Sequence, residues 1–538
     1  MLDRNHIART GPMLFLKILS LMFALQLTFS VSAQTMADRC TGQDTPVERL
    51  LLQQATADSI IIKWRGEADS VCVGTRLELL HIDSTAVAEG NHKVARIEGL
   101  EADTKYYYSI GSGPTGKANH YFHTAPAPNS LPEDGNIRLW LLGDSGTAGE
   151  IDDEGVSEHP GEALMVKEGY YRFLRQQENY ETADLVLLLG DNAYPSGTDQ
   201  QWQHSFFNIY PEEIQTTTIV PTIGNHEMGM GPFDACPFSE LLGGIPGCDA
   251  GPVVIPIGGA SMASDPMSYD SNGGGPDGTG MPYLDIFTLP SRGEAGGVPS
   301  GTEQYYSIDY GIVHIVSLDS QLSVQDPDQL DAMAQWLQDD LIENSLAWTV
   351  VIFHHPPYSK GHNHDSDLED REIWMREKIN PIIDEYGVDV VYGGHAHSYE
   401  RSWYLNGHYG NSESFDSTQH AELDASGNPA YGQAGAPYQQ VSPSTDRDNR
   451  TVYTVNGSSG GIGGDQELPC EAAIYVGCTM PDWLEHPAHR DFQPLHPDFL
   501  PHGIERQGSV VLDANETQLI SRFVDLNGEV LDYFVIQR

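Results

Sequence analysis

Five short motifs carrying aspartate, asparagine or histidine follow one another along this chain, and each lies at the end of an apolar run. They are Gly143-Asp144-Ser145-Gly146, Gly190-Asp191-Asn192-Ala193-Tyr194, Gly224-Asn225-His226-Glu227, Val351-Ile352-Phe353-His354 and Gly394-His395-Ala396-His397. Short apolar runs are typical of buried strands, and α/β sheets place their sites at the carboxyl ends of strands. The pattern therefore predicts an α/β domain in which these side chains meet at one edge of a sheet.

The side chains in these motifs are metal ligands of several kinds: carboxylate, phenolate, amide and imidazole. A single motif of this type is typical of a polar turn at a strand end, but five of them supply enough ligands for two adjacent metal ions. Two cations about 3.5–4 Å apart can activate water and hold a phosphate ester. The set therefore predicts a binuclear metal site for hydrolysis of phosphate esters.

The charge of the chain excludes one class of partner. The sequence has 77 acidic and 28 basic residues among 538, which gives a formal net charge of −49. Because a surface of this sign repels polyanions, we do not expect nucleic-acid binding through phosphate contacts. A well-solvated acidic surface is the simplest interpretation, and a dedicated cationic partner is the alternative. The sequence does not indicate an oligomeric state.

Residues 1–33 are predicted to be a signal peptide. Positively charged residues up to Lys17 precede an apolar stretch at 18–29, and Val31-Ser32-Ala33 offers small residues for cleavage. The apolar stretch is short for a membrane span, so we expect no stable membrane anchor, with an uncleaved anchor as the alternative. We therefore expect an exported protein, either periplasmic or extracellular.

Export makes the cysteines informative, because disulfides persist outside the reducing cytosol. The candidates for disulfide bonds are Cys40, Cys72, Cys236, Cys248, Cys470 and Cys478. Pairing in sequence order is the simplest of the fifteen ways to join six cysteines. None of the cysteines lies in a C-x-x-C pair, so a thiolate metal site is not expected.

The chain divides into an all-β region and an α/β region. Residues 45–125 are predicted to form an all-β module, and residues 126–136 are predicted to be a linker rich in proline and glycine. From Ile137 onward, strands alternate with helices. The expected strands cover 137–142, 185–189, 218–223, 306–318 as a hairpin, 348–353 and 388–392, and the expected helices cover 164–178, 330–342 and 373–386.

Two polar stretches interrupt this alternation. Residues 228–302 are crowded with glycine and proline, and residues 406–448 are loop-like. Because both follow ligand motifs, they are interpreted either as rims of the active site or as tolerated surface insertions. The C-terminal residues 509–537 are predicted to form strands joined by an Asn527-Gly528 hairpin turn.

Together with the segment Gly394–Ser402, the five motifs resemble the metallophosphoesterase superfamily and, within it, the purple acid phosphatases. The order of the two regions is similar to that of the plant-type members. The segment 99–110, with Tyr106 as corner tyrosine, resembles fibronectin type III domains. The resemblance implies a four-layer α/β/β/α catalytic domain over residues 136–538, after a fibronectin type III-like sandwich over residues 45–125.

The resemblance also implies how two metal ions are held. The first ion, iron(III) in this family, would be bound by the following residues: Asp144, Asp191, Tyr194 and His397. Asp191 would bridge to a second ion, zinc, manganese or iron(II), bound also by Asn225, His354 and His395. Tyr194 is the family's chromophore position, and the alternative is that it only packs against the site.

Further residues are expected to act on the substrate. Besides Asp191, the catalytic candidate is His226, as a donor to the phosphate or the leaving oxygen. Asn225, His226 and His364 are the substrate-binding candidates, with His362 as the alternative to His364.

Three residues are expected to support the site without binding metal. Glu227 is expected to steady a ligand loop. His355, which follows His354, is expected to point to the opposite face of the strand and either to support a ligand or to be structural. Arg401 is expected to pair with a carboxylate rather than with phosphate.

These inferences predict a secreted acid phosphatase that hydrolyses small phosphomonoesters by attack of a metal-bound hydroxide. A phosphodiesterase or nucleotide hydrolase on the same scaffold is the alternative. A non-catalytic adhesion protein that uses the all-β module and retains a silent metal core is a further alternative.

Overall fold

The computed structural model describes eight segments of the chain, and the account below concerns them alone. They are residues 40–149, 160–177, 181–195, 197–227, 281–361, 364–440, 449–462 and 483–538. The predicted signal peptide lies outside the described residues, as do His362 and four of the six cysteines. No described helix has the length and apolar character needed to cross a membrane.

The fold is mixed α/β and is built on two large sheets. The larger sheet has eleven strands in the order β17-β21-β20-β19-β9-β10-β11-β1-β2-β6-β5. Its strands are β1 (Glu48–Gln53), β2 (Ser59–Arg65), β5 (Val87–Glu89), β6 (His92–Glu98), β9 (Ile137–Leu142), β10 (Leu185–Leu188), β11 (Thr218–Pro221), β17 (Tyr438–Gln439), β19 (Gly508–Ala514), β20 (Gln518–Asp525) and β21 (Val530–Gln537). Strands β9, β10, β11 and β1 run parallel at its centre.

The second sheet has six strands in the order β12-β13-β14-β15-β18-β16. They are β12 (Tyr306–Tyr310), β13 (Val313–Ser317), β14 (Trp348–Ile352), β15 (Val390–Gly393), β16 (Tyr399–Arg401) and β18 (Val452–Asn456). Strands β12 and β13 form the predicted antiparallel hairpin. Strands β13, β14, β15 and β18 are parallel, so the chain segments that leave β14 and β15 emerge at the same edge.

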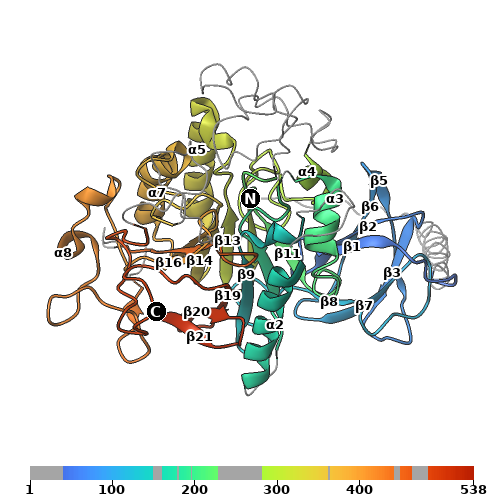
Figure 1. Ribbon diagram of the computed structural model, residues 1–538. Coiled ribbons are helices and arrows are strands. Elements are labelled where there is room, and N and C mark those ends of the chain that lie inside the picture. Colours follow the sequence, from blue (N-terminus) through green and yellow to red (C-terminus); the bar gives the residue numbers. More distant parts are fainter. Residues whose placement is uncertain are drawn as a thin grey trace, which may run out of the picture.

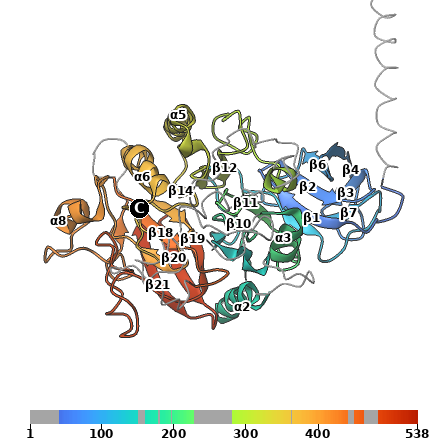
Figure 2. The ribbon, with the colours of Figure 1, turned by 45° about the horizontal axis from the view of Figure 1, so that its top comes forward.

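The two sheets face each other between layers of helices (Figure 2). Val350 of β14 belongs to the core shared by the two sheets, whereas Val351 belongs to a second core under the helices α5 (Pro327–Glu343) and α7 (Asn380–Tyr386). This alternation is the two-residue period of a strand that is buried on both faces. On the other side, α2 (Pro160–Gln176) packs against β19 and β20.

The helices agree with the expected ranges, with differences at their ends. Helix α5 begins at Pro327 because Asp326 caps it, accepting hydrogen bonds from two backbone N–H groups, and proline suits the first helical position. The single helix predicted over 373–386 consists of α6 (Asp370–Trp374), a π turn over Met375–Ile379, and α7.

The smaller helical elements lie in the loops and insertions. They are η1 (Ser145–Gly149), α3 (Asp199–Trp202), the π turn η2 (Gln203–Phe207), α4 (Pro282–Ile286), η6 (Ser323–Gln325), η8 (Ser412–Ser414) and α8 (Ser417–His420). Helix α4 lies in the described end of the first predicted insertion. The second predicted insertion, at 406–448, holds η8, α8 and β17.

The N-terminal region is a two-sheet β structure at one side of the molecule, blue in Figure 1. Strands β1, β2, β6 and β5 face a second sheet of β4 (Ile82–Thr85), β3 (Ser70–Gly74), β7 (Lys105–Ile110) and β8 (Tyr121–His123). Between the sheets lies a separate core that contains Trp64 and Tyr108. The Tyr106 hydroxyl accepts a hydrogen bond from the backbone N–H of Glu101 at 2.9 Å.

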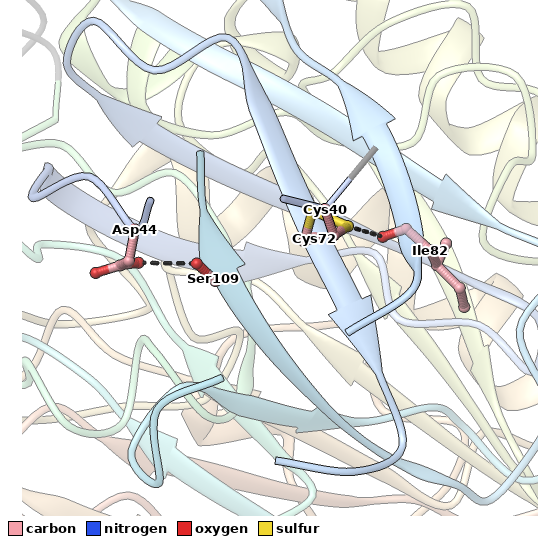
Figure 3. The surroundings of a disulfide bond; sticks show 5 residues. All are labelled: Cys40, Asp44, Cys72, Ile82 and Ser109. Atoms are coloured by element: carbon pink, nitrogen blue, oxygen red, sulfur yellow. Dashed lines mark hydrogen bonds between the residues drawn. A yellow bond between two sulfur atoms is a disulfide. The ribbon is translucent and has the colours of Figure 1, made fainter. Parts of the chain in front are cut away.

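One disulfide bond joins Cys40 to Cys72 on β3, as pairing in sequence order predicts (Figure 3). Sγ of Cys40 lies 3.8 Å from the carbonyl oxygen of Ile82 on the neighbouring strand β4. Next to it, the Ser109 hydroxyl donates to Asp44 at 3.1 Å. These contacts fasten residues 40–44 to β3 and β7 of the N-terminal region.

Candidate metal centre

All five motifs meet where the carboxyl ends of the parallel strands of the two sheets come together. Asp144, Asp191 and Asn225 follow β9, β10 and β11 of the larger sheet, and His354 and His395 follow β14 and β15 of the smaller one. The sheets are joined there by a bond from the backbone N–H of His395 to Asp144 Oδ2 at 2.8 Å. The predicted gathering of side chains at one edge thus involves two sheets.

The backbone of these loops is unusual. Asp144 and Asp191 have φ of 54°, and His395 has φ of 70°, a region that residues other than glycine seldom adopt. Strain of this kind concentrates at functional sites. Gly394 precedes His395, and a Cβ at that position would lie 2.3 Å from Asp144 Oδ2. A glycine is therefore required for the close approach of the two loops.

Four of the predicted ligands form one group around the hydroxyl of Tyr194. Its Oη lies 3.1 Å from Asp144 Oδ1, 3.2 Å from Asp191 Oδ2 and 2.9 Å from His397 Nε2. His397 Nε2 also lies 3.4 Å from Asp144 Oδ1. The residues expected to bind the first ion are thus brought together.

The second group is centred on His354. Its Nδ1–H donates to the carbonyl oxygen of Leu189 at 2.9 Å, which fixes the ring and leaves Nε2 facing inward. Nε2 lies 3.2 Å from Asp191 Oδ2 and 3.0 Å from Asn225 Oδ1. Asp191 therefore contacts both groups, as a bridging ligand must.

The electrostatics of these groups fit bound cations. A neutral His354 that donates through Nδ1 directs the Nε2 lone pair at the carboxylate oxygen of Asp191, an arrangement that is repulsive unless positive charge lies between them. Burial opposes protonation of His354, yet the Asp191 and Asp144 carboxylates raise its pKa to about 9. The donor set, rich in oxygen around Tyr194 and in imidazole around His354, suits a trivalent and a divalent ion respectively.

His395 is held by a carboxylate that the motifs did not reveal. Its Nε2 lies 3.0 Å from Glu369 Oε2, and the other oxygen of Glu369 lies 2.7 Å from His364 Nδ1. Burial and the neighbouring His364 lower the pKa of His395 to about 4, so this imidazole is neutral and able to ligate through Nδ1. The ring of His364 packs against that of His395 at a tilt of 40°, with centroids 3.7 Å apart.

The expectation for the direction of His355 is wrong. Strand β14 ends at Ile352, so the two-residue alternation no longer applies, and the rings of His354 and His355 lie 4.8 Å apart. One nitrogen of His355 lies within 4.8 Å of ligand nitrogens on His354 and His395. The Ser320 hydroxyl accepts from the backbone N–H groups of His354 and His355 and lies 3.0 Å from His355 Nδ1.

His226 lies at the rim of the site. Its backbone N–H donates to Asp191 Oδ1 at 2.7 Å, and its ring packs against that of Tyr194 at a tilt of 36°, with centroids 4.2 Å apart. Nδ1 lies 2.6 Å from the carbonyl oxygen of Pro195, so Nδ1–H donates and Nε2 faces the site, 3.8 Å from Asp191 Oδ2. The ring of His226 is therefore held in one orientation and faces the site, but it does not belong to either group of candidate ligands.

Glu227 ties two ligand loops together. Its carboxylate accepts from the backbone N–H groups of Asp191 at 2.9 Å, Asn192 at 2.6 Å and Gly224 at 2.6 Å. Burial and the negative charge of Asp191 raise the pKa of Glu227 to about 7. The side chain thus makes the kind of contact expected of a residue that steadies the loops.

Arg401 does not face the site. Its guanidinium pairs with the buried carboxylate of Asp532 at 2.6 Å, and Tyr399 and Arg490 bind the same carboxylate. The predicted carboxylate partner is therefore present. Sequence reasoning missed Glu369 and Ser320 because both act from outside the five motifs. Ser320, three residues after the apolar strand β13, carries the weak signal of a polar residue near a strand end.

Comparison with known proteins agrees with this geometry. Residues 137–399 match the family model described as calcineurin-like phosphoesterase. The chain is 37% identical over 311 residues to purple acid phosphatase 22 of Arabidopsis thaliana, covering 57% of this chain and 52% of the relative. It is 24% identical over 319 residues to phosphoenolpyruvate phosphatase of Allium cepa, covering 58% and 50%. The chain thus spans about half the length of these curated relatives.

Two solved structures share the fold. The purple acid phosphatase PPD1 from yellow lupin seeds superposes with a TM-score of 0.57 at 18% identity, covering 91% of this chain and 74% of that chain. The structure of PhoD gives a TM-score of 0.50 at 13% identity, with coverage of 91% and 88%.

Proposed function

Because residues 137–399 match the calcineurin-like phosphoesterase family model, we propose that this chain is an exported binuclear-metal acid phosphatase that hydrolyses phosphomonoesters of small molecules. The observation that carries the proposal is the contact of Asp191 with both groups of donors, 3.2 Å from Tyr194 Oη and 3.2 Å from His354 Nε2. The similarity to purple acid phosphatases supports it.

We assign the ligands as follows. The site of iron(III) comprises Asp144, Asp191, Tyr194 and His397, and the site of zinc, manganese or iron(II) comprises Asp191, Asn225, His354 and His395. When bound, such ions supply water activation and neutralise the charge that develops on the phosphoryl group. The oxygen-rich and imidazole-rich character of the two groups supports this order of metals.

His226 is assigned as the proton donor to the leaving group. Its Nδ1–H donates to the Pro195 carbonyl, which fixes the ring and directs Nε2 at the site, the nitrogen from which a general acid would transfer its proton. The hydrogen bond from the backbone N–H of His226 to Asp191 keeps the residue in this position. Together with the Asn225 amide, His226 also contacts the substrate in this assignment.

His364 is assigned to bind the phosphate group of the substrate. Glu369 lies 2.7 Å from Nδ1 of its ring and orients the ring, so Nε2 is the nitrogen that would contact the phosphate. Burial opposes ionisation of Glu369, but the His364 and His395 imidazoles hold the pKa of this carboxyl below its usual range. His364→Ala should raise KM for a phosphomonoester and leave bound metal unchanged, whereas a loss of metal would reject the assignment.

The domain assignments follow the same resemblance. We propose a fibronectin type III-like domain over 45–125, supported by the two-sheet core and by the corner bond of Tyr106, and a four-layer α/β/β/α catalytic domain over 136–538 with insertions at 228–302 and 406–448. In the second insertion, Ser412 N donates to Asp367 at 2.8 Å on the loop that carries His364. This contact supports a role for that insertion at the rim of the site.

Export to the periplasm or the exterior is proposed from the predicted signal peptide at 1–33, and the Cys40–Cys72 disulfide supports an oxidising location. Mass spectrometry of the exported protein should find a mature chain that begins near Gln34. The mass should increase on reduction and alkylation at all six cysteines, in agreement with pairs Cys236–Cys248 and Cys470–Cys478. An intact Met1 or six free thiols would contradict this.

Metal analysis combined with a substrate panel tests the function. The purified protein should contain two metals per chain and should hydrolyse a simple phosphomonoester faster than a bis-ester or ATP at acid pH. Faster cleavage of the bis-ester or of ATP would assign it instead as a phosphodiesterase or nucleotide hydrolase. Lack of turnover in protein fully loaded with metal would favour a non-catalytic adhesion role.

A further inference from the structure

The N-terminal module (residues 45–125) contacts the catalytic part through a shared sheet as well as through side chains. Strand β1 pairs in parallel with β11, with Leu52 opposite Thr218, and the N–H of Leu52 donates to the carbonyl of Ile214 at 3.0 Å. From the second sheet of the module, the Tyr108 hydroxyl on β7 donates to the carbonyl of Gln215 at 2.8 Å. Strand β11 leads directly to Asn225.

Arg49 of the module is buried among residues of the catalytic part. Its guanidinium donates to both carboxylate oxygens of Asp199 at 2.7 and 2.9 Å and to Gln203 Oε1 at 2.9 Å, and it lies over the ring of Phe207. Only 4% of its side chain is exposed. The register between β1 and β2 shifts between Glu48 and Leu51, and Arg49 has φ of 50°. Such a bulge re-aims a side chain, here away from the module.

A second arginine of the module binds the same carboxylate. Arg65, at the end of β2, donates to Asp199 at 2.6 and 2.9 Å and lies 3.3 Å from Asp285. Two guanidinium groups therefore converge on Asp199, which is the first residue of helix α3. Paired bidentate contacts of this kind fix both position and orientation.

Helix α3 and the π turn after it hold the loop that carries two predicted ligands. We call residues 191–195, which include Asp191 and Tyr194, the ligand loop. Gly197, next to the α3 cap Thr198, donates its N–H to the carbonyl of Ala193 at 2.9 Å, and the Ser205 hydroxyl donates to the carbonyl of Asn192 at 2.6 Å. A displacement of α3 would therefore move the ligand loop.

We infer that Arg49 and Arg65 are positioning residues for the metal centre: through Asp199 and α3, the N-terminal module fixes the loop that holds Asp191 and Tyr194. The module thereby acts on the site at a distance, although it contributes no ligand among the described residues. This inference rests on the proposed function for the identity of the ligands, but the contacts themselves do not depend on catalysis.

The test compares Arg49→Met and Arg65→Met, which remove the charge and keep most of the volume, with Lys93→Met. Lys93 pairs with the exposed Asp69 inside the same module at 2.6 Å, so it is matched for charge and location. Amide hydrogen exchange of the full-length, metal-free protein should become about tenfold faster or more in peptides from 185–195 for both arginine variants. Peptides from β19–β21 should not change, and neither should any peptide of Lys93→Met.

A second readout separates positioning from general stabilisation. Zinc-loaded protein is mixed with a chelator far below its unfolding temperature, and zinc release should be faster in both arginine variants than in wild type and Lys93→Met. Unchanged exchange in 185–195 with unchanged zinc release would overturn the inference, as would equal acceleration of exchange in all peptides. If Arg49→Met does not fold, Arg65→Met, whose side chain is 19% exposed, decides the question. Because hydrogen exchange is measured without substrate or metal, absence of phosphatase activity would count against the proposed function alone.

Discussion

Nε2 of His354 and Oδ2 of Asp191 face each other across 3.2 Å inside the protein. Since the Nδ1–H of His354 is already bound to a backbone carbonyl, this contact needs a cation or a proton between the two atoms. The pKa of about 9 at His354 has the same physical origin, the pull of two buried carboxylates on positive charge. Replacing one of these two residues is therefore the most direct test of the metal assignment.

Replacement of Asp191 by alanine should abolish turnover, because it removes the carboxylate that touches both groups of donors. Loss of several kcal/mol of charge stabilisation corresponds to a rate loss of roughly 10³-fold or more. Metal content and hydrolysis of a phosphomonoester should be measured together, with the exposed Asp69→Ala as control. If Asp191→Ala kept most of the activity, the two-metal assignment would be wrong.

Replacement of Tyr194 by phenylalanine should remove the colour of the oxidised, iron-loaded protein. An iron(III)–phenolate bond absorbs visible light by charge transfer, and Tyr194 Oη is the phenol oxygen placed between Asp144 and Asp191. The variant should keep most of its metal and part of its activity. Tyr107→Phe, in the N-terminal module, is the control and should stay coloured. A colourless wild type that contains iron would refute the purple acid phosphatase assignment but not the broader phosphoesterase one.

Replacement of His226 by alanine should lower the rate by roughly 10²–10⁴ with both metals retained, as loss of a general acid does. The loss should be smaller for substrates with good leaving groups, since these need less protonation. His496→Ala, an exposed histidine, serves as the control. Equal losses across leaving groups would assign His226 to substrate binding instead.

The stability of the protein should fall between neutral and alkaline pH because of His314. Burial disfavours its charged form, but Asp309 at 2.7 Å and Asp340 at 2.8 Å raise its pKa to about 9 from the ordinary 6.5. The folded state thus binds the proton more tightly, so the stabilisation is complete below pH 6.5 and is lost as the pH rises through 9. The shift corresponds to on the order of 3 kcal/mol.

Urea unfolding at pH 6 and pH 10 would measure this effect. The free energy of unfolding of wild type should decline between the two values, and His314→Gln should decline less while being the less stable protein at pH 6. The same pH dependence in wild type and His314→Gln would show that other groups are responsible.

The sequence predicted that the loops carrying the candidate ligands would meet, and it did so for a physical reason. Each loop is a local unit, a short apolar strand followed by glycine and a polar residue, and parallel strands bring such ends to one edge. Asp144 and His395, 251 residues apart, meet because each lies directly after its strand. The hairpin of β12 and β13 and the helix α5 were predictable on the same local grounds.

The features that sequence reasoning missed depend on non-local packing. The contact of Glu369 with His395 arises from the path of the loop after β14, which no periodicity encodes. The direction of His355 was wrong because the strand ends at Ile352, and strand ends are set by tertiary contacts. The pairing of β1 with β11 joins regions predicted as separate, since edge-to-edge pairing leaves no mark in either strand alone.

The β1–β11 pairing has a practical consequence for dissecting the protein. A chain cut at residue 136 would lose the strand that covers β11, and the N–H and carbonyl groups of a central strand would become an open edge. Open edges of hydrophobic strands recruit other strands, so the isolated catalytic region should self-associate. Light scattering of such a truncated chain would reveal the self-association. The N-terminal module is therefore expected to be needed to keep the catalytic region soluble.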